Sequence, residues 1–302
     1  RKCSICPRHR PPKIVTQPST MIPRELDQKI VHALLDAAIL EDVGRGDLTS
    51  LAVIPAGTIF EGVMAAREDM VCAGLPLAAL VFAKFSGAIE WNALVTDSDK
   101  VPAGTELARV RGPAVDLLSA ERTAINLLQH LSGIATLTRR YVEAINETES
   151  ILLDTRKTIP GYRDLAKYAT RMGGATNHRM RLDDGVLIKD NHVAVTGGVS
   201  KAIQLAQQAG LRDIEVECDT LSQVEEALAA GADSILLDNM PAAMMAEAVA
   251  LIDGRVPTEA SGDINLDTIR AAAEAGVTYI SVGRLTHSAR AINIGLDWKT
   301  AS

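Results

Sequence analysis

Aromatic residues are scarce in this sequence. Phe, Tyr and Trp together make up 3% of the 302 residues, whereas the hydrophobic content as a whole is 47%. So few rings leave no series of stacking platforms of the kind that bind single-stranded nucleic acids. The composition therefore predicts a globular protein whose cores are filled by Ala, Leu, Val and Ile.

The sequence also lacks an excess of basic charge and any long apolar run. Its net charge is −7 and its pI about 5.4, whereas a general nucleic-acid binder carries a basic face. No run approaches the roughly 18 apolar residues of a membrane span, and none has the apolar centre of a signal peptide. We expect neither nucleic acid nor a membrane as partner.

Cysteine is rare as well. The four cysteines are Cys3, Cys6, Cys72 and Cys218. They form no disulfide framework, which favours a reducing cytoplasm as the location. Cys3 and Cys6, with His9 nearby, offer half of a zinc site, but no second Cys pair completes it. Residues 1–20 are basic and Pro-rich, and we predict a flexible tail there.

The region before residue 150 has the pattern of an α+β unit. Helical spacing of leucines predicts a helix over 24–40, and the Gly-containing segment 41–49 is interpreted as a turn with a capping Asp or Thr. Short alternating strands broken by Gly and Pro occupy 58–115, with one helix at 76–85. Residues 116–147 are strongly helical. A polar stripe interrupts their apolar face: Glu121, Arg122, Asn126 and His130. This stripe is either a solvated helix face or a ligand or interface surface centred on Arg122.

From residue 151 the chain becomes periodic, and strand-like segments alternate with amphipathic helices. The six segments end near Asp154, Lys189, Glu217, Asp238, Glu259 and Ser281. Such repeats predict parallel βα units, which occur both in open doubly wound sheets and in barrels. Nearly every segment ends in a polar residue, and only in a barrel do all strand ends face one pocket. We therefore favour a (β/α) barrel, complete or short of eight strands.

Cationic residues gather after the first two of these strands. They are Arg156, Lys157, His178, Arg179 and Lys189. Because the chain is acidic overall, this local excess predicts a small substrate with several negative charges.

Acids and glycine-containing turns follow the later strands. Glu217 and Asp238 are placed to hold ribose hydroxyls or a hydrated Mg²⁺, although each alone is also compatible with a structural salt bridge. The turns that begin at Ser261-Gly262 and Ser281-Val282-Gly283 each lead to a helix, where barrels often bind a phosphate. The residues thus indicate an enzyme that joins a phosphorylated sugar to a polyanionic small molecule.

Ordered motifs from about residue 24 to 298 resemble the quinolinate phosphoribosyltransferases, also called nicotinate-nucleotide pyrophosphorylases (carboxylating), of the type II phosphoribosyltransferase family. The motifs are EDVGRGDLT (41–49), ERTAIN (121–126), DTRKT (154–158), NHR (177–179), IKDNH (188–192), LDN (237–239), EASG (259–262) and SVG (281–283).

The resemblance implies an N-terminal α/β sandwich domain over 21–131, joined by 290–302, and an incomplete α/β barrel domain over 132–289. It implies a homodimer with shared active sites. The implied reaction joins quinolinate to phosphoribosyl pyrophosphate with Mg²⁺, giving nicotinate mononucleotide, pyrophosphate and CO2 in de novo NAD biosynthesis. One alternative is a paralogous phosphoribosyltransferase that acts on another heteroaromatic acid, and another is a non-catalytic anion-binding protein.

The resemblance also implies roles for single residues. Quinolinate would be bound by Thr155, Arg156, His178, Arg179 and Lys189, with Arg122 from the neighbouring subunit. Phosphoribosyl pyrophosphate would be bound by Lys157, Glu217, Asp238, Asn239, Ser261, Gly262, Asp263, Ser281, Val282 and Gly283. The catalytic residues would be Lys157, Glu217 and Asp238, and Mg²⁺ would be held mostly through substrate near the two acids. Three positions depart from the usual pattern, namely Ala175, Asp183 and Asp263, and they affect the expected loop geometry.

Overall fold

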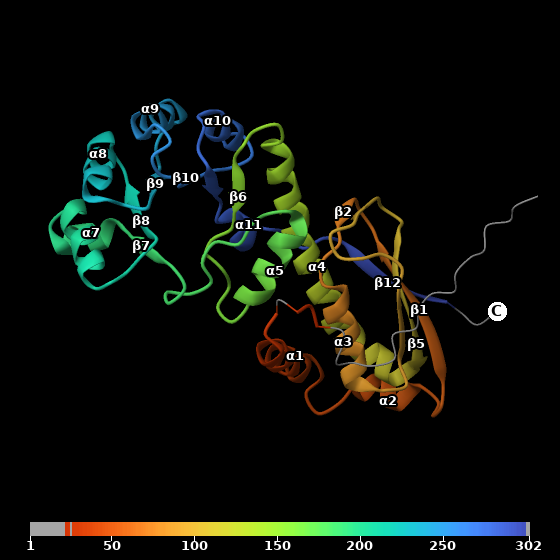
Figure 1. Cartoon of the computed structure of the whole chain (residues 1–302). Helices are drawn as coiled ribbons and strands as arrows, with labels where there is room; N and C mark the ends of the chain where they lie inside the picture. Colours follow the sequence, from red (N-terminus) through yellow and green to blue (C-terminus); the bar gives the residue numbers. More distant parts are fainter. Residues whose placement is uncertain (1–21, 25, 300–302) are drawn as a thin grey trace, which may run out of the picture.

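The computed structural model describes residues 22–24 and 26–299 (Figure 1). The Cys3–Cys6 pair and the tail predicted for residues 1–20 lie outside this part of the chain. Two hydrophobic cores organise the described residues, one in the N-terminal α/β region and one in the barrel. The long helix α4 contributes buried residues to both.

The N-terminal region packs helices against an antiparallel sheet. The sheet has the strand order β12-β1-β5-β3. Its edge strand β12 comes from the C-terminal end of the described residues and pairs with β1. Its strands are β1 (Ile59–Ala66), β3 (Glu90–Ala93), β5 (Glu106–Pro113) and β12 (Ile294–Lys299). A second, two-stranded sheet pairs β2 (Met70–Val71) with β4 (Lys100–Val101). The helices are α1 (Gln28–Val43), α2 (Leu48–Val53), α3 (Leu75–Phe85) and α4 (Ala114–Ala144).

Side-chain caps set the helix starts differently from the sequence prediction. The first helix begins at Gln28, because Asp27 accepts hydrogen bonds from the backbone of Lys29 and Ile30. It continues to Val43, so that part of the predicted turn over 41–49 is helical. The capping aspartate expected in that segment is Asp47, which accepts from the Ser50 backbone at 2.9 Å and starts α2.

The barrel region contains six parallel strands in the order β6-β11-β10-β9-β8-β7. They are β6 (Ile151–Leu153), β7 (Val186–Ile188), β8 (Ile214–Cys218), β9 (Ser234–Asp238), β10 (Thr258–Ser261) and β11 (Tyr279–Ser281). The edge strands β6 and β7 are not paired with each other, which confirms the expected incomplete barrel.

Helices follow the barrel strands, and the longer ones after β7, β8 and β9 lie along the outside of the sheet (Figure 1). The longer ones are α5 (Arg163–Gly173), α7 (Val199–Gln208), α8 (Leu221–Ala230) and α9 (Ala242–Ile252). The shorter ones are α6 (Asp190–Thr196), α10 (Ile269–Glu274) and α11 (Arg284–His287). α2, α6 and α11 were not predicted, since four to seven residues are too few to display a helical period. No helix among the described residues is long and apolar enough to cross a bilayer.

Helix α4 connects the two regions through a close backbone approach at Gly133. A Cβ atom at this position would lie 2.0 Å from the carbonyl oxygen of Arg290, in the segment that leads into β12. The helix therefore reaches this segment only because residue 133 has no side chain.

Gly133→Ala should destabilise the protein by about 2–3 kcal/mol, although alanine is favoured over glycine in a helix by about 1 kcal/mol. The added Cβ must push α4 away from residue 290. Gly87→Ala is the control, because a Cβ there meets no atom within 4 Å. Urea unfolding of both variants measures the difference, and an equal effect of the two substitutions would contradict the packing argument.

Candidate functional site

One cavity of about 420 Å³ lies at the carboxyl ends of the barrel strands. Its lining residues are Thr155, Arg156, Lys157, His178, Arg179, Leu187, Lys189, Leu236, Asp238, Glu259, Ser261, Gly262, Asp263, Ile264, Ser281, Val282, Gly283, Arg284, His287 and Ser288. They come from the ends of five strands, from the segment that follows α5, and from α11 with the residue after it. The five cationic side chains singled out in the sequence all line this one cavity.

Three residues of the predicted set do not line the cavity. Glu217 is nearly buried and forms an ion pair with Lys189, which does line it. Asn239 lies beside Asp238, whose carboxylate accepts a hydrogen bond from its amide at 2.6 Å. Arg122 is exposed on α4 and is not part of the cavity formed by its own chain.

Two arginines form the most basic wall of the cavity. The Nε atom of Arg156 is buried and has no hydrogen-bond partner among the described residues. Burial and the neighbouring charge of Arg156 both lower the pKa of Arg179. Arg179 is held by the carbonyl oxygen of Gly185, to which its Nη1 donates at 2.8 Å. Like charges held together in this way favour binding of an anion.

The imidazole ring of His178 lies next to two carboxylates inside the barrel. Its Nε2 atom lies 3.4 Å from Glu215 and 3.3 Å from Glu259. Burial lowers the pKa of His178, but the hydrogen bonds to these glutamates raise it by more, to about 9. The backbone N–H of Arg179 donates to Nδ1 at 2.7 Å and favours the neutral ring. In this low-dielectric interior one backbone N–H dipole changes the pKa less than two carboxylates do. The pKa of His178 therefore stays raised.

The acidic side of the cavity is centred on Asp238 and Glu217. The Nζ atom of Lys189 donates to Glu217 at 2.5 Å, while the side chain of Lys189 remains 47% exposed. Burial and then the charge of Glu217 raise the pKa of Asp238. The single lysine thus leaves part of the negative charge here uncompensated, which favours a further cation.

Two glycine-containing turns line the cavity at Ser261-Gly262 and at Ser281-Val282-Gly283. At Gly262 a Cβ would lie 2.2 Å from Oδ1 of Asn239, and at Gly283 it would lie 2.9 Å from Cδ of Lys157. The hydroxyls of Ser261 and Ser281 are hydrogen-bonded at 3.0 Å, which links the two turns. The absence of side chains therefore lets these turns pack closely against Asn239 and Lys157, and glycine-containing turns after late barrel strands are a common place for a phosphate to bind.

Sequence reasoning missed several residues of the site. α11 and the residue after it contribute Arg284, His287 and Ser288 to the cavity lining. Glu215 lies 3.4 Å from Nε2 of His178 inside the barrel. Strand alternation offered a signal for Glu215, because residues two apart face the same side and Glu217 had been selected. His287 follows Gly283 by one helical turn, but the helix was too short to be predicted.

The three departures from the family pattern fit the local backbone. Ala175 is buried in the barrel core and does not have the positive φ that would require glycine. Asp183 is exposed and pairs with Arg181 at 2.9 Å. Asp263 adopts a φ of 45°, which aspartate tolerates better than most residues.

Two family models match the chain in sequence order. They are described as the N-terminal domain and the C-terminal domain of quinolinate phosphoribosyl transferase, and they match residues 47–132 and 134–297. The chain belongs to the quinolinate phosphoribosyltransferase family.

Individual members of this family are similar over most of their length. The chain is 44% identical over 267 residues to the nicotinate-nucleotide pyrophosphorylase (carboxylating) of Mycobacterium leprae, which covers 86% of this chain and 94% of that protein. It is 40% identical over 291 residues to a quinolinate phosphoribosyltransferase (decarboxylating) of Nicotiana tabacum, covering 89% and 83%. The solved nicotinate-nucleotide pyrophosphorylase of Francisella tularensis superposes with a TM-score of 0.87 at 37% identity, covering 91% and 98%.

The His178 imidazole should titrate well above the usual value. Its folded-state pKa of about 9 exceeds the ordinary 6.5, so its stabilising contribution is complete below pH 6.5 and is lost as the pH rises through 9. NMR titration of histidine-labelled protein measures this directly. Glu259→Gln removes one carboxylate and should move the titration towards 6.5. A wild-type value at or below 6.5 would contradict the assignment.

Proposed function

We propose that this chain catalyses transfer of the phosphoribosyl group from phosphoribosyl pyrophosphate to quinolinate, giving nicotinate mononucleotide, pyrophosphate and CO2. The observation that carries the proposal is one cavity lined by the five cationic side chains singled out in the sequence, by Arg284 and by two glycine-containing turns. Family membership supports this choice over a non-catalytic anion-binding protein, and so does the pair of acids near the cavity.

Quinolinate carries two carboxylates on adjacent ring carbons, and the basic wall suits both. Arg156, Arg179 and a protonated His178 supply positive charge within one side of the cavity. Nε of Arg156, which meets no acceptor among the residues that the structure describes, is a donor that a carboxylate would satisfy. Thr155 and Lys189 lie at the edges of the same wall. We assign the quinolinate site to these residues.

The opposite side suits the phosphoribosyl group. The backbone of Ser261-Gly262-Asp263 and of Ser281-Val282-Gly283 would hold the 5′-phosphate. Lys157 lies against Gly283 and would face the pyrophosphate. Asp238 would bind the ribose hydroxyls. Asn239 lies beside it, and Glu217 is paired with Lys189 next to it.

The donor set also fits Mg²⁺, because it offers carboxylate oxygens whose charge is only partly compensated. Asp238 would hold the ion together with substrate oxygens, and the charge of Glu217 nearby would favour its binding. When bound, Mg²⁺ would neutralise charge on the pyrophosphate.

The reaction requires stabilisation of charge more than proton transfer. As pyrophosphate leaves C1 of the ribose, positive charge develops on the sugar and Asp238 stabilises it electrostatically, while Lys157 stabilises the leaving group. The pyridine nitrogen carries no proton and attacks C1 with its own lone pair, so no general base is needed. The ring nitrogen is then cationic, which allows the neighbouring C2–carboxylate bond to break with release of CO2 and uptake of a proton at C2.

We further propose that the active unit is a homodimer in which Arg122 completes the neighbouring subunit's site. Arg122 is exposed on α4 and lies outside the cavity of its own chain. Exposed apolar side chains on α1 and α2 support an interface in the same region, because Leu40 and Leu48 are 69% and 83% exposed.

Quinolinate and phosphoribosyl pyrophosphate together should release pyrophosphate and CO2 in equal amounts, and nicotinate should be a very poor substitute. A substrate with one carboxylate leaves a buried cation unpaired, which costs about 3 kcal/mol and lowers kcat/KM about 100-fold. A coupled pyrophosphate assay with each acid decides this. Equal efficiencies would contradict the two-carboxylate assignment, and turnover with a different heteroaromatic acid alone would favour the paralogous activity.

Arg122→Ala and Asp238→Ala should each give a nearly inactive homodimer. A mixed dimer would contain one doubly damaged site and one intact site, so we expect about half of wild-type activity per dimer if the sites are independent. The two variants would be co-expressed with different tags and the heterodimer purified and assayed. A folded heterodimer without activity would rule out the shared site.

A further inference from the structure

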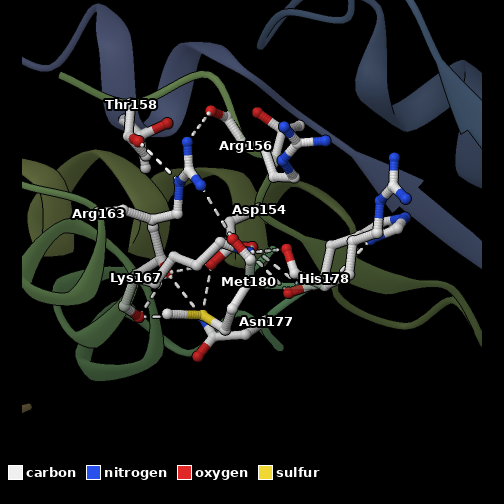
Figure 2. A network of polar contacts seen from close by, with 12 residues as sticks. Asp154, Arg156, Thr158, Arg163, Lys167, Asn177, His178 and Met180 are labelled. Carbon is white, nitrogen blue, oxygen red and sulfur yellow. Dashed lines mark hydrogen bonds and ion pairs between the residues drawn. The ribbon is translucent and has the colours of Figure 1, made fainter. Parts of the chain in front are cut away.

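Helix α5 has an apolar face and a polar face that serve different parts of the molecule. Leu165, Tyr168 and Ala169 belong to the N-terminal hydrophobic core. Arg163 and Lys167, one helical turn apart, point instead towards the segments that follow β6 and α5 (Figure 2). Neither of these two cations lines the cavity, and neither has a role in the reaction proposed above.

Lys167 uses all three of its protons inside the protein. Its side chain is 0% exposed, and its Nζ atom donates to Asp154 at 2.6 Å, to the His178 carbonyl at 2.6 Å and to the Arg179 carbonyl at 3.0 Å. A lysine ammonium has no more than three donors, so no further bond to a ligand is available without breaking one of these.

Asp154 holds the same segment from the other side. Its Oδ1 atom accepts from the backbone N–H of His178 at 2.9 Å. Its Oδ2 atom accepts from the Thr170 hydroxyl at 2.8 Å and from the Asn177 amide. The backbone N–H and C=O groups of His178 are therefore both bound by the Asp154–Lys167 pair (Figure 2).

Arg163 connects two segments that are far apart along the chain. Its Nε donates to the Thr158 hydroxyl at 3.2 Å, its Nη1 to the Met180 carbonyl at 3.0 Å, and its Nη2 to the Arg156 carbonyl at 3.4 Å. A guanidinium presents these donors in a rigid plane, so it fixes the separation of the segments as well as tying each one down.

We propose that Arg163 and Lys167 are positioning residues for quinolinate, which fix the backbone of residues 156–158 and 178–180 so that Arg156, His178 and Arg179 match two adjacent carboxylates. This inference rests on the function proposed above. The two carboxylates of quinolinate are attached to one rigid ring, and a displacement of about 1 Å in a binding group can cost about 100-fold in rate.

The phosphate turns of the phosphoribosyl side should not depend on these two residues. Lys157 lies within residues 156–158, but it is also held from α11, where the Thr286 hydroxyl donates to the Lys157 carbonyl at 2.8 Å. Within the described part of the chain, the turns at 261–263 and 281–283 receive no hydrogen bond from Arg163 or Lys167. They are held instead by their own strands and by the Ser261–Ser281 contact. The proposal therefore predicts a selective effect on one substrate.

Arg163→Lys keeps the charge but loses the planar fork. We expect the KM for quinolinate to rise about tenfold or more, with a lower kcat, while the KM for phosphoribosyl pyrophosphate changes less than about twofold. Leu165→Ala is the matched control, since it weakens the packing of the same helix without touching these hydrogen bonds. It should lower Tm and leave both KM values unchanged. Equal increases in both KM values for Arg163→Lys, or the same split for Leu165→Ala, would overturn the proposal.

Lys167 is tested by Lys167→Met together with Asp154→Asn, because the single change would leave a buried carboxylate unpaired. Hydrogen exchange of the backbone amides in residues 177–180 is the second readout, and we expect it to accelerate in this variant and in Arg163→Lys but not in Leu165→Ala. Unchanged exchange in both variants would overturn the proposal. If the wild type releases no pyrophosphate with quinolinate, the proposed function fails, and the exchange experiment still decides whether these residues hold the segment.

Discussion

The ion pair between Asp154 and Lys167 is the interaction on which the basic side of the site depends. Both side chains are 0% exposed. Burying two charges is costly, and apolar residues of similar volume are often as stabilising, so the pair is poorly explained by stability alone. Its other hydrogen bonds go to the backbone of the segment that carries His178 and Arg179. The pair therefore holds the backbone of a short irregular segment that belongs to no strand or helix.

A second constraint is the repulsion among the cations of the cavity. Burial and then the charge of Arg156 lower the pKa of Arg179, and Nε of Arg156 has no hydrogen-bond partner in the described part of the chain. Two groups of acids compensate part of this positive charge. Glu215 and Glu259 face His178 inside the barrel, and Glu217 forms an ion pair with Lys189. Compensation is therefore partial, and the remaining positive potential is available to an anionic substrate. Acids of the inner barrel surface thus offset part of the repulsion within the cluster of cations in the free protein.

The sequence was sufficient to predict the elements whose pattern is local. Six strand-like segments with polar ends predicted the parallel sheet and the meeting of Arg156, His178 and Lys189 at one edge. Interactions between distant residues were not predictable in this way. Lys167 looked like an ordinary polar position of an amphipathic helix, because its partners lie 11 to 13 residues away on two other segments. The role proposed for Arg122 requires a second copy of the chain, which no pattern within one chain can display.

Helix α5 makes the two substrate sides of the cavity unequal. Its apolar face belongs to the N-terminal core, so the segment 177–180 is anchored through α5 to a part of the molecule outside the barrel. The glycine-containing turns are anchored within the barrel sheet itself. Motion between the N-terminal region and the barrel would therefore shift the basic wall relative to the phosphate turns. The close approach of α4 to the segment before β12, made possible by Gly133, opposes such motion. The approach of α4 at Gly133 thus helps to keep the basic wall and the phosphate turns at a fixed distance from each other.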